Sequence, residues 1–156
     1  MDAPAELTAM LQRSVRSLDE AGVPDEALAA LKHRRVGGDR LVPAGRAWRL
    51  GVLLLDRSAT LYATGEVTRA VEPLRGVTNR SAEAEARRAV RHLAARSRFP
   101  EGEVVNFGHA PVGPGDELLP IVDGVILVRW SGSFTRPLAD YLADRVALLV
   151  DAATGR

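Results

Sequence analysis

One stretch constrains the fold more than any other: residues 47–70, which read AWRLGVLLLDRSATLYATGEVTRA. Two runs of strand-forming residues flank a polar turn at residues 56–59. The first run is apolar on both faces over its second half, which is typical of a strand covered on both sides. The second run alternates apolar and polar residues, which is typical of a half-buried strand. The stretch therefore predicts a β-hairpin at the centre of the domain, but it does not predict a function.

Charged side chains on this hairpin form a possible ligand surface. If a helix does not cover their side of the sheet, they make an open polar face; if it does, they are edge charges. Across the two strands we expect Glu66 to pair with Arg49. The charged members are Arg46, Arg49, Glu66 and Arg69, with Tyr62 and Thr64 beside them.

Two helices are predicted before the hairpin. Leucines at helical spacing indicate a helix over residues 4–21 that ends at Gly22. Pro24 and the acidic residues after it predict a second helix, stopped by the glycines at 37–38. Residues 1–35 would then form a helical hairpin, packed either on the domain's own sheet or on a partner.

After the hairpin, residues 81–98 are predicted to form a crossover helix with an alanine-rich face, followed by a strand at 103–108. This order predicts a right-handed βαβ unit, with the new strand parallel to the hairpin's second strand. Residues 109–123 are predicted to form a loop, and residues 124–130 are predicted to form a buried strand. A last helix is expected over 137–151.

The fold class predicted is α+β, as a single domain over residues 1–156. It would contain the helical hairpin at 1–35 and, at 46–152, a central mixed sheet of about four strands with the crossover and C-terminal helices. The chain has 46% hydrophobic and 26% charged residues, which is typical of a globular domain. It has no cysteine, which excludes disulfides and thiolate metal sites. The acidic N-terminus and short apolar runs predict a soluble, cytoplasmic protein with no membrane association.

The best local candidate for a binding site is residues 130–137, WSGSFTRP. Here a strand is expected to end and a helix to begin, and free N–H groups at a helix start favour an anion. Hydroxyls and a guanidinium could join those groups around a phosphate or a carboxylate. The alternative is that Ser133 or Thr135 only caps the helix. The candidate ligand-binding residues are Trp130, Ser131, Gly132, Ser133, Thr135 and Arg136.

Nucleophilic catalysis is a second hypothesis for the same region. Ser131 or Ser133 would attack, His109 would act as the base, and Asp123 or Asp116 would orient the imidazole. Neither serine lies in a G-x-S-x-G elbow. The sequence therefore leaves open whether the chain is an enzyme.

Metal binding is a third hypothesis, since the loop at 109–123 offers His109, Asp116, Glu117 and Asp123. Their spacing matches no histidine-based metal motif. We therefore expect a solvated acidic loop, with no metal and no cofactor.

The sharpest charge pattern is a stripe of arginines on the helix expected at 81–98. Its members fall within about 40° of one another on a helical wheel. The stripe could be a solvated face, a contact with a protein partner or a second copy of the chain, or a track for a phosphate backbone. A net charge of only +1 and the lack of interleaved aromatic residues argue against nucleic acid. The stripe is Arg80, Arg87, Arg91 and Arg98, and its acidic counterpart on the last helix is Asp140, Asp144 and Asp151.

The strings GRAWRLGVLLL, ATGEVTR and GVILVRWS resemble a group of short, uncharacterised proteins of high-GC bacteria over most of the chain. Some of those proteins carry a transferred glutaminase label, which implies either a Ser-x-x-Lys motif or a catalytic cysteine. The single lysine, Lys32, has Ala29 three positions before it, and the chain has no cysteine. The residues do not support that label here.

From these observations we expect a non-enzymatic module that binds a small anion or a protein partner, with a homodimer as one form of the latter. A small hydrolase using a serine and His109 is the alternative. Nucleic-acid binding through the arginine stripe is a further alternative.

Overall fold

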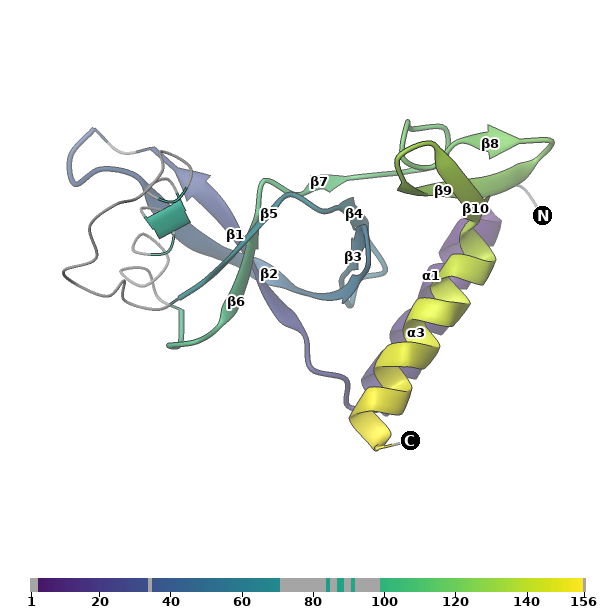
Figure 1. The fold of residues 1–156 in the computed structure, drawn as a ribbon, viewed down its shortest axis with the longest axis horizontal. Coiled ribbons are helices and arrows are strands. Elements are labelled where there is room, and N and C mark those ends of the chain that lie inside the picture. The colour runs from purple at the N-terminus through teal and green to yellow at the C-terminus, as the bar shows by residue number, and fades with distance from the viewer. Residues whose placement is uncertain are drawn as a thin grey trace. The chain divides into compact units, whose positions relative to one another are not determined.

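The computed structural model describes residues 3–33, 35–70, 84, 87–88, 91 and 99–155, and it mixes helices and strands (Figure 1). In chain order the elements are α1 (Ala3–Glu20), β1 (Glu26–Lys32), β2 (Arg40–Leu50), β3 (Leu53–Leu55), β4 (Leu61–Ala63), β5 (Glu66–Arg69), β6 (Val104–Phe107), β7 (Ala110–Pro111), β8 (Ile121–Val122), β9 (Val125–Ser131), β10 (Phe134–Pro137) and α3 (Leu138–Thr154).

The strands form a seven-stranded sheet, in the order β5-β6-β1-β2-β3-β4-β7, and a three-stranded sheet, in the order β10-β9-β8. The larger sheet is mixed, because β1 runs parallel to β6 while β5 and β6 are antiparallel. The prediction of about four strands is therefore wrong in number. The difference has three causes: a predicted helix forms β1, the predicted loop contributes β7, and each run of the predicted hairpin is divided into two strands, β2 with β3 and β4 with β5. The strand predicted at 124–130 is β9, which belongs to the smaller sheet.

The chain divides into two compact units, each built from segments that are separate along the sequence. The α1–α3 unit contains residues 1–25, 47–64 and 110–156, and the β1–β6 unit contains residues 26–46 and 65–109. The chain passes between the units four times, so neither unit is one continuous piece of sequence. The single domain over 1–156 stays a prediction.

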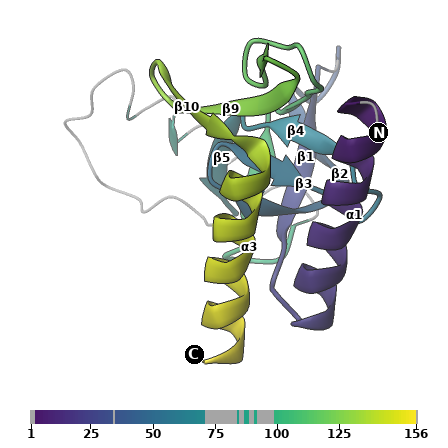
Figure 2. The same cartoon turned by 90° about the vertical axis from the view of Figure 1, so that its right-hand side faces the viewer.

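Two long helices pack side by side in the α1–α3 unit (Figure 2). The structure confirms both: α1 ends just before Gly22, whose φ of 64° lets the chain turn away, and α3 follows the predicted apolar stripe. Their apolar faces join the strands in one core. The largest buried side chains of that core are Leu18, Trp48, Leu50, Leu53, Leu55, Leu119, Leu138, Tyr141 and Leu142.

The polar turn predicted at residues 56–59 is confirmed between β3 and β4. The Asp56 carboxylate accepts hydrogen bonds from the backbone N–H groups of Ser58 and Thr60, both at 2.9 Å. Ala59 takes a positive φ of 61° inside the turn. An aspartate that binds its own following backbone is a strong local turn signal, which is why the sequence was sufficient here.

The first run of the predicted hairpin is not one strand. It folds back at Gly51 and Val52, so that Leu50 lies opposite Leu53 across a two-residue turn. The hairpin is therefore a three-stranded meander of β2, β3 and β4. All three leucines of β3 are completely buried, which confirms that this run is covered on both faces.

A tyrosine from α3 holds this unexpected turn. The Tyr141 hydroxyl donates to the carbonyl oxygen of Leu50 and accepts from the N–H of Val52, each at 2.9 Å. Gly51 has a φ of 67°, and a Cβ added to it would lie 2.0 Å from the Tyr141 oxygen. Only glycine fits this position, both by conformation and by space.

Trp48 links β2 to the segment after α1. Its indole N–H donates to the carbonyl oxygen of Val23 at 2.8 Å, and the Arg57 guanidinium lies 4.5 Å from the ring centre. Arg57 also pairs with the carboxylate of Asp25. The aromatic side chain is thus buried with its polar group satisfied.

The second helix predicted for residues 1–35 is wrong, because residues 26–32 form β1 in the β1–β6 unit. Ala27 lies opposite Val105, and Leu28 opposite Asn106, in a parallel ladder with β6. The Asn106 side chain also donates to the carbonyl oxygen of Ala27 at 3.1 Å. Alanine and leucine favour helices locally, but pairing and burial on both faces outweigh that preference here.

The strand predicted at 103–108 is confirmed as β6, but its predicted partner geometry is wrong. β5 runs antiparallel to β6, with Glu66 opposite Phe107 and Arg69 opposite Val104. These two strands are therefore not joined as a parallel βαβ pair. Gly65 allows the close approach, since a Cβ there would lie 2.3 Å from the Phe107 carbonyl oxygen.

Only four residues of the helix predicted at 81–98 are described, and all four are helical: Ala84, Arg87, Arg88 and Arg91. The rest of that prediction lies outside the described residues.

The strand predicted at 124–130 forms β9. It is half-buried, with Ile126 and Val128 buried while Val125 and Trp130 are exposed. The preceding stretch, 109–123, is mainly loop and turn as expected, apart from the short strands β7 and β8. Within the described part of the chain, no helix combines the length and the apolar character needed to cross a membrane.

Candidate functional site

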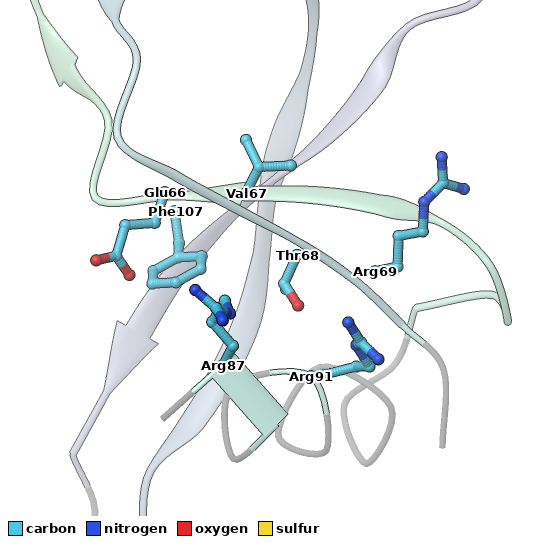
Figure 3. A pocket seen from close by; sticks show the side chains of 7 residues that line it. All are labelled: Glu66, Val67, Thr68, Arg69, Arg87, Arg91 and Phe107. Atoms are coloured by element: carbon cyan, nitrogen blue, oxygen red, sulfur yellow. The ribbon is translucent and has the colours of Figure 1, made fainter. Parts of the chain in front are cut away.

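A pocket in the β1–β6 unit is the best candidate for a functional site. Its cavity measures about 590 Å³, within the range of small-molecule sites. We call it the Arg–Phe pocket. It is lined by Glu66, Val67, Thr68 and Arg69 of β5, Phe107 of β6, and Arg87 and Arg91 (Figure 3).

Strand geometry decides which side chains share a face of the pocket. Successive side chains of β5 alternate, and Glu66 lies directly opposite Phe107 on the neighbouring strand. In Figure 3 the Thr68 hydroxyl and the Phe107 ring point toward Arg87 and Arg91, while Val67 projects from the other side of the strand. The pocket therefore combines an aromatic ring, a hydroxyl and two guanidinium groups on one side of β5.

Arg87 and Arg91 provide the positive charge on that side. They are one helical turn apart, so their side chains leave the helix on the same face. Both are exposed, and neither has an ion-pair partner among the residues that the structure describes. A guanidinium presents paired N–H donors that match the oxygens of a phosphate or a carboxylate.

The two remaining charges of the pocket flank this centre. Arg69 extends away from Arg87 in Figure 3, and its Nη1 lies 3.5 Å from the carbonyl oxygen of Gly102. Glu66 is exposed at the Phe107 end of the pocket. Among the described residues that line the pocket, three arginines and one glutamate give an excess of positive charge.

The arginine stripe is described only in part. Arg87 and Arg91 line the pocket, whereas Arg80 and Arg98 lie outside the described residues. The acidic residues proposed as its counterpart belong to α3 in the other unit, where Asp144 pairs with Arg136 at 2.7 Å.

Two of the charges predicted to form a polar surface on the hairpin, Glu66 and Arg69, do line a pocket. The expected pair of Glu66 and Arg49 is not formed across strands, because Arg49 lies opposite Leu54 on β3. Arg46 instead pairs with Glu103. The sequence did not single out Phe107, because the predicted parallel pairing does not give the antiparallel register in which Phe107 lies opposite Glu66.

The helix-start geometry expected at residues 130–137 is wrong. This segment forms the β9–β10 hairpin, in which Thr135 lies opposite Arg129 and Arg136 opposite Val128. α3 begins only at Leu138, and no side chain caps it, so the capping alternative is wrong as well. The β-branched Thr135 and the preceding Phe134 favour a strand at this point.

The β9–β10 hairpin still presents several of the predicted ligand-binding residues to solvent. Trp130 and Phe134 stack with ring centres 5.9 Å apart, and both are exposed. Ser131 and Ser133 are also exposed, on either side of Gly132, whose φ is 54°. Binding by this segment stays a prediction.

The residues of the predicted catalytic trio are divided between the two units. His109 belongs to the β1–β6 unit, while Ser131, Ser133 and Asp123 belong to the α1–α3 unit. Burial lowers the pKa of His109 below its usual value, which favours the neutral imidazole near pH 7. The hydrolase stays a hypothesis.

Asp116, the other acidic candidate of the loop, has a structural partner, since its carboxylate accepts from the N–H of Gly113 at 2.7 Å. Among the described residues, no cluster of three or more histidine, aspartate or glutamate side chains could hold a metal ion.

The Arg–Phe pocket thus combines a cavity with two guanidinium groups that have no ion-pair partner among the described residues. Its chemistry suits an anion with an apolar portion. No protein-family model, curated protein or solved structure matches this chain, so its function is inferred from the residues of the Arg–Phe pocket.

Proposed function

We propose that this protein binds a small anion, a phosphate or carboxylate compound, in the Arg–Phe pocket. The observation that carries the proposal is the pair of exposed guanidinium groups, Arg87 and Arg91, facing the Thr68 hydroxyl across a cavity of about 590 Å³. Bidentate arginine contacts recognise such anions through geometry as well as charge.

The expected affinity is modest. Hydrogen bonds to charged groups contribute about 1.5–3 kcal/mol each, so two arginines would contribute about 3–6 kcal/mol. This corresponds to dissociation constants of roughly 6 mM to 40 μM. Because both side chains are exposed, added salt should weaken the binding.

Isothermal titration calorimetry with inorganic phosphate and with citrate tests the proposal. Arg87→Ala and Arg91→Ala should each weaken binding by about tenfold or more, and the double variant should abolish it. Arg16→Ala is the matched control, since Arg16 is an exposed arginine of α1 in the other unit. It removes the same charge from the protein and should leave the affinity unchanged.

Two results would count against the proposal. If neither anion binds at low ionic strength, the pocket is not an anion site. If Arg16→Ala weakens binding as much as Arg87→Ala does, the effect is one of net charge and not of the pocket.

A further inference from the structure

We infer that the ligand of the Arg–Phe pocket is a nucleoside monophosphate whose base carries an amino group. This inference rests on the proposed function, because it places the phosphate at Arg87 and Arg91. The inference adds a role for two pocket residues that an inorganic anion would not contact, namely Phe107 and Glu66.

The pocket has a chemical direction. Figure 3 shows Glu66 and the Phe107 ring at one end, Arg87 and the Thr68 hydroxyl at the centre, and Arg91 beyond them. A ligand bound along this direction would place a hydrogen-bond donor near Glu66 and a planar apolar ring against Phe107. Its hydroxyl groups would lie at the centre, and its anion would lie at the arginine end. Base, ribose and phosphate follow one another in that sequence in a nucleoside monophosphate.

Phe107 is the ring platform. Its side chain is partly exposed within the pocket and lies on the side of the sheet that faces the arginines. A phosphate ion alone would leave this apolar surface in water. A base stacked on it would cover the ring, as aromatic side chains do in many nucleotide sites.

Glu66 determines which chemical group of the ligand can lie at the end away from the phosphate. It lies directly opposite Phe107 in the β5–β6 ladder, and it makes no ion pair with any described residue. A carboxylate accepts hydrogen bonds but repels a second anion. It therefore favours an amino group on the edge of the stacked base, and it disfavours a ligand with phosphates at both ends.

Size agrees with this assignment. The cavity of about 590 Å³ is far larger than an inorganic phosphate and lies within the range that holds drug-sized molecules. A ribose phosphate without a base would fill only the arginine end.

Calorimetric titration with AMP, UMP, ribose 5-phosphate and inorganic phosphate tests the inference. AMP should bind about 5- to 150-fold more tightly than ribose 5-phosphate, the range that base stacking supplies. AMP should also bind more tightly than UMP, whose base has no amino group. Phe107→Leu keeps an apolar side chain but removes the ring, so it should abolish the advantage of AMP over ribose 5-phosphate.

Two features of the design keep the result interpretable. Because Phe107 packs against the core of its unit, urea unfolding of Phe107→Leu shows whether the variant is folded. The exposed Glu66→Gln should reduce the preference for AMP over UMP while leaving ribose 5-phosphate binding intact or slightly stronger.

Different results would overturn the nucleotide assignment and the proposed anion binding. Equal affinity for AMP and ribose 5-phosphate, both weakened by Arg87→Ala, would overturn the nucleotide assignment and leave anion binding in place. Lack of binding by all four compounds would overturn both. Tighter binding of a short oligoadenylate than of AMP would replace the free nucleotide with single-stranded nucleic acid.

Discussion

The two units of this protein differ in which of their polar groups have partners. In the α1–α3 unit, the buried aromatic side chains have partners for their polar groups: Trp48 donates to a backbone carbonyl, and Tyr141 bonds to both sides of a turn. In the β1–β6 unit, Arg87 and Arg91 face a cavity with no ion-pair partner among the described residues.

The cores of the two units also differ, in the size of their buried side chains. Leucines, a tryptophan and a tyrosine fill the core of the α1–α3 unit, whereas alanines are most of the core residues that the structure describes in the β1–β6 unit, with Phe107 packed at its margin. Large buried side chains contribute more transfer free energy than alanines do. The described residues therefore place the large buried side chains in the α1–α3 unit and two guanidinium groups beside a cavity in the β1–β6 unit.

The largest effect is expected at Gly51. Gly51→Ala forces a Cβ into contact with the Tyr141 oxygen and puts alanine at a φ of 67°, so it should destabilise the protein by about 3 kcal/mol. Urea unfolding measures the change. Gly113→Ala is the control, because Gly113 lies in the same unit, has no positive φ and has no atom within 4 Å of the place that an added methyl group would take. Equal stability of the two variants would show that the Tyr141 contact does not constrain the turn.

Trp48→Phe should cost about 2 kcal/mol, because it leaves the Val23 carbonyl without its indole donor and opens space in the core. Chemical denaturation checks the loss of stability, and calorimetry with inorganic phosphate checks that the affinity stays the same. A Trp48→Phe variant that keeps its stability but loses phosphate binding would reverse the roles assigned to the two units.

Tyr62→Phe should cost about 1 kcal/mol at neutral pH, because it removes the 3.0 Å bond to the Asp56 carboxylate. Burial and the Asp56 carboxylate raise the pKa of Tyr62 above its ordinary value of 10.0. The unfolded chain therefore loses this proton first, so Tyr62 stabilises the fold below pH 10.0 and that contribution disappears as the pH rises through the higher folded value.

Unfolding free energies measured from about pH 7 to about pH 11 test this dependence. The decline at the alkaline end should be shallower in Tyr62→Phe than in the unaltered protein. Identical slopes would show that the Tyr62 hydroxyl has the same pKa in the folded and unfolded states.

The smallest effect on stability is expected from the residues with the largest expected effect on binding. Arg87→Ala with Arg91→Ala should change the unfolding free energy by no more than about 0.5 kcal/mol, since both side chains are exposed and make no described ion pair. Denaturant unfolding of the double variant checks this. A loss of about 2 kcal/mol or more would mean that the arginines hold the β1–β6 unit together, and the contrast between the units would fail.

Elements with local sequence signals were predictable from the amino-acid sequence. Both long helices follow apolar residues at helical spacing, and the turn after β3 follows from an aspartate that binds its own backbone. β6 and β9 were also found, because their β-branched and apolar residues are flanked by turn residues.

Features that depend on partners distant in the chain were not predictable from the sequence, because long-range contacts set them. Residues 26–32 favour a helix locally and become a strand because β6 offers a ladder; Gly51 makes a turn because Tyr141 reaches it from α3. The candidate site was predictable only in pieces. The sequence marked Glu66, Arg69, Arg87 and Arg91 as two unrelated groups, but strand register and helix position put them around Phe107 in one pocket. Periodicity records which face a residue occupies within its own element, whereas long-range pairing decides what that face meets.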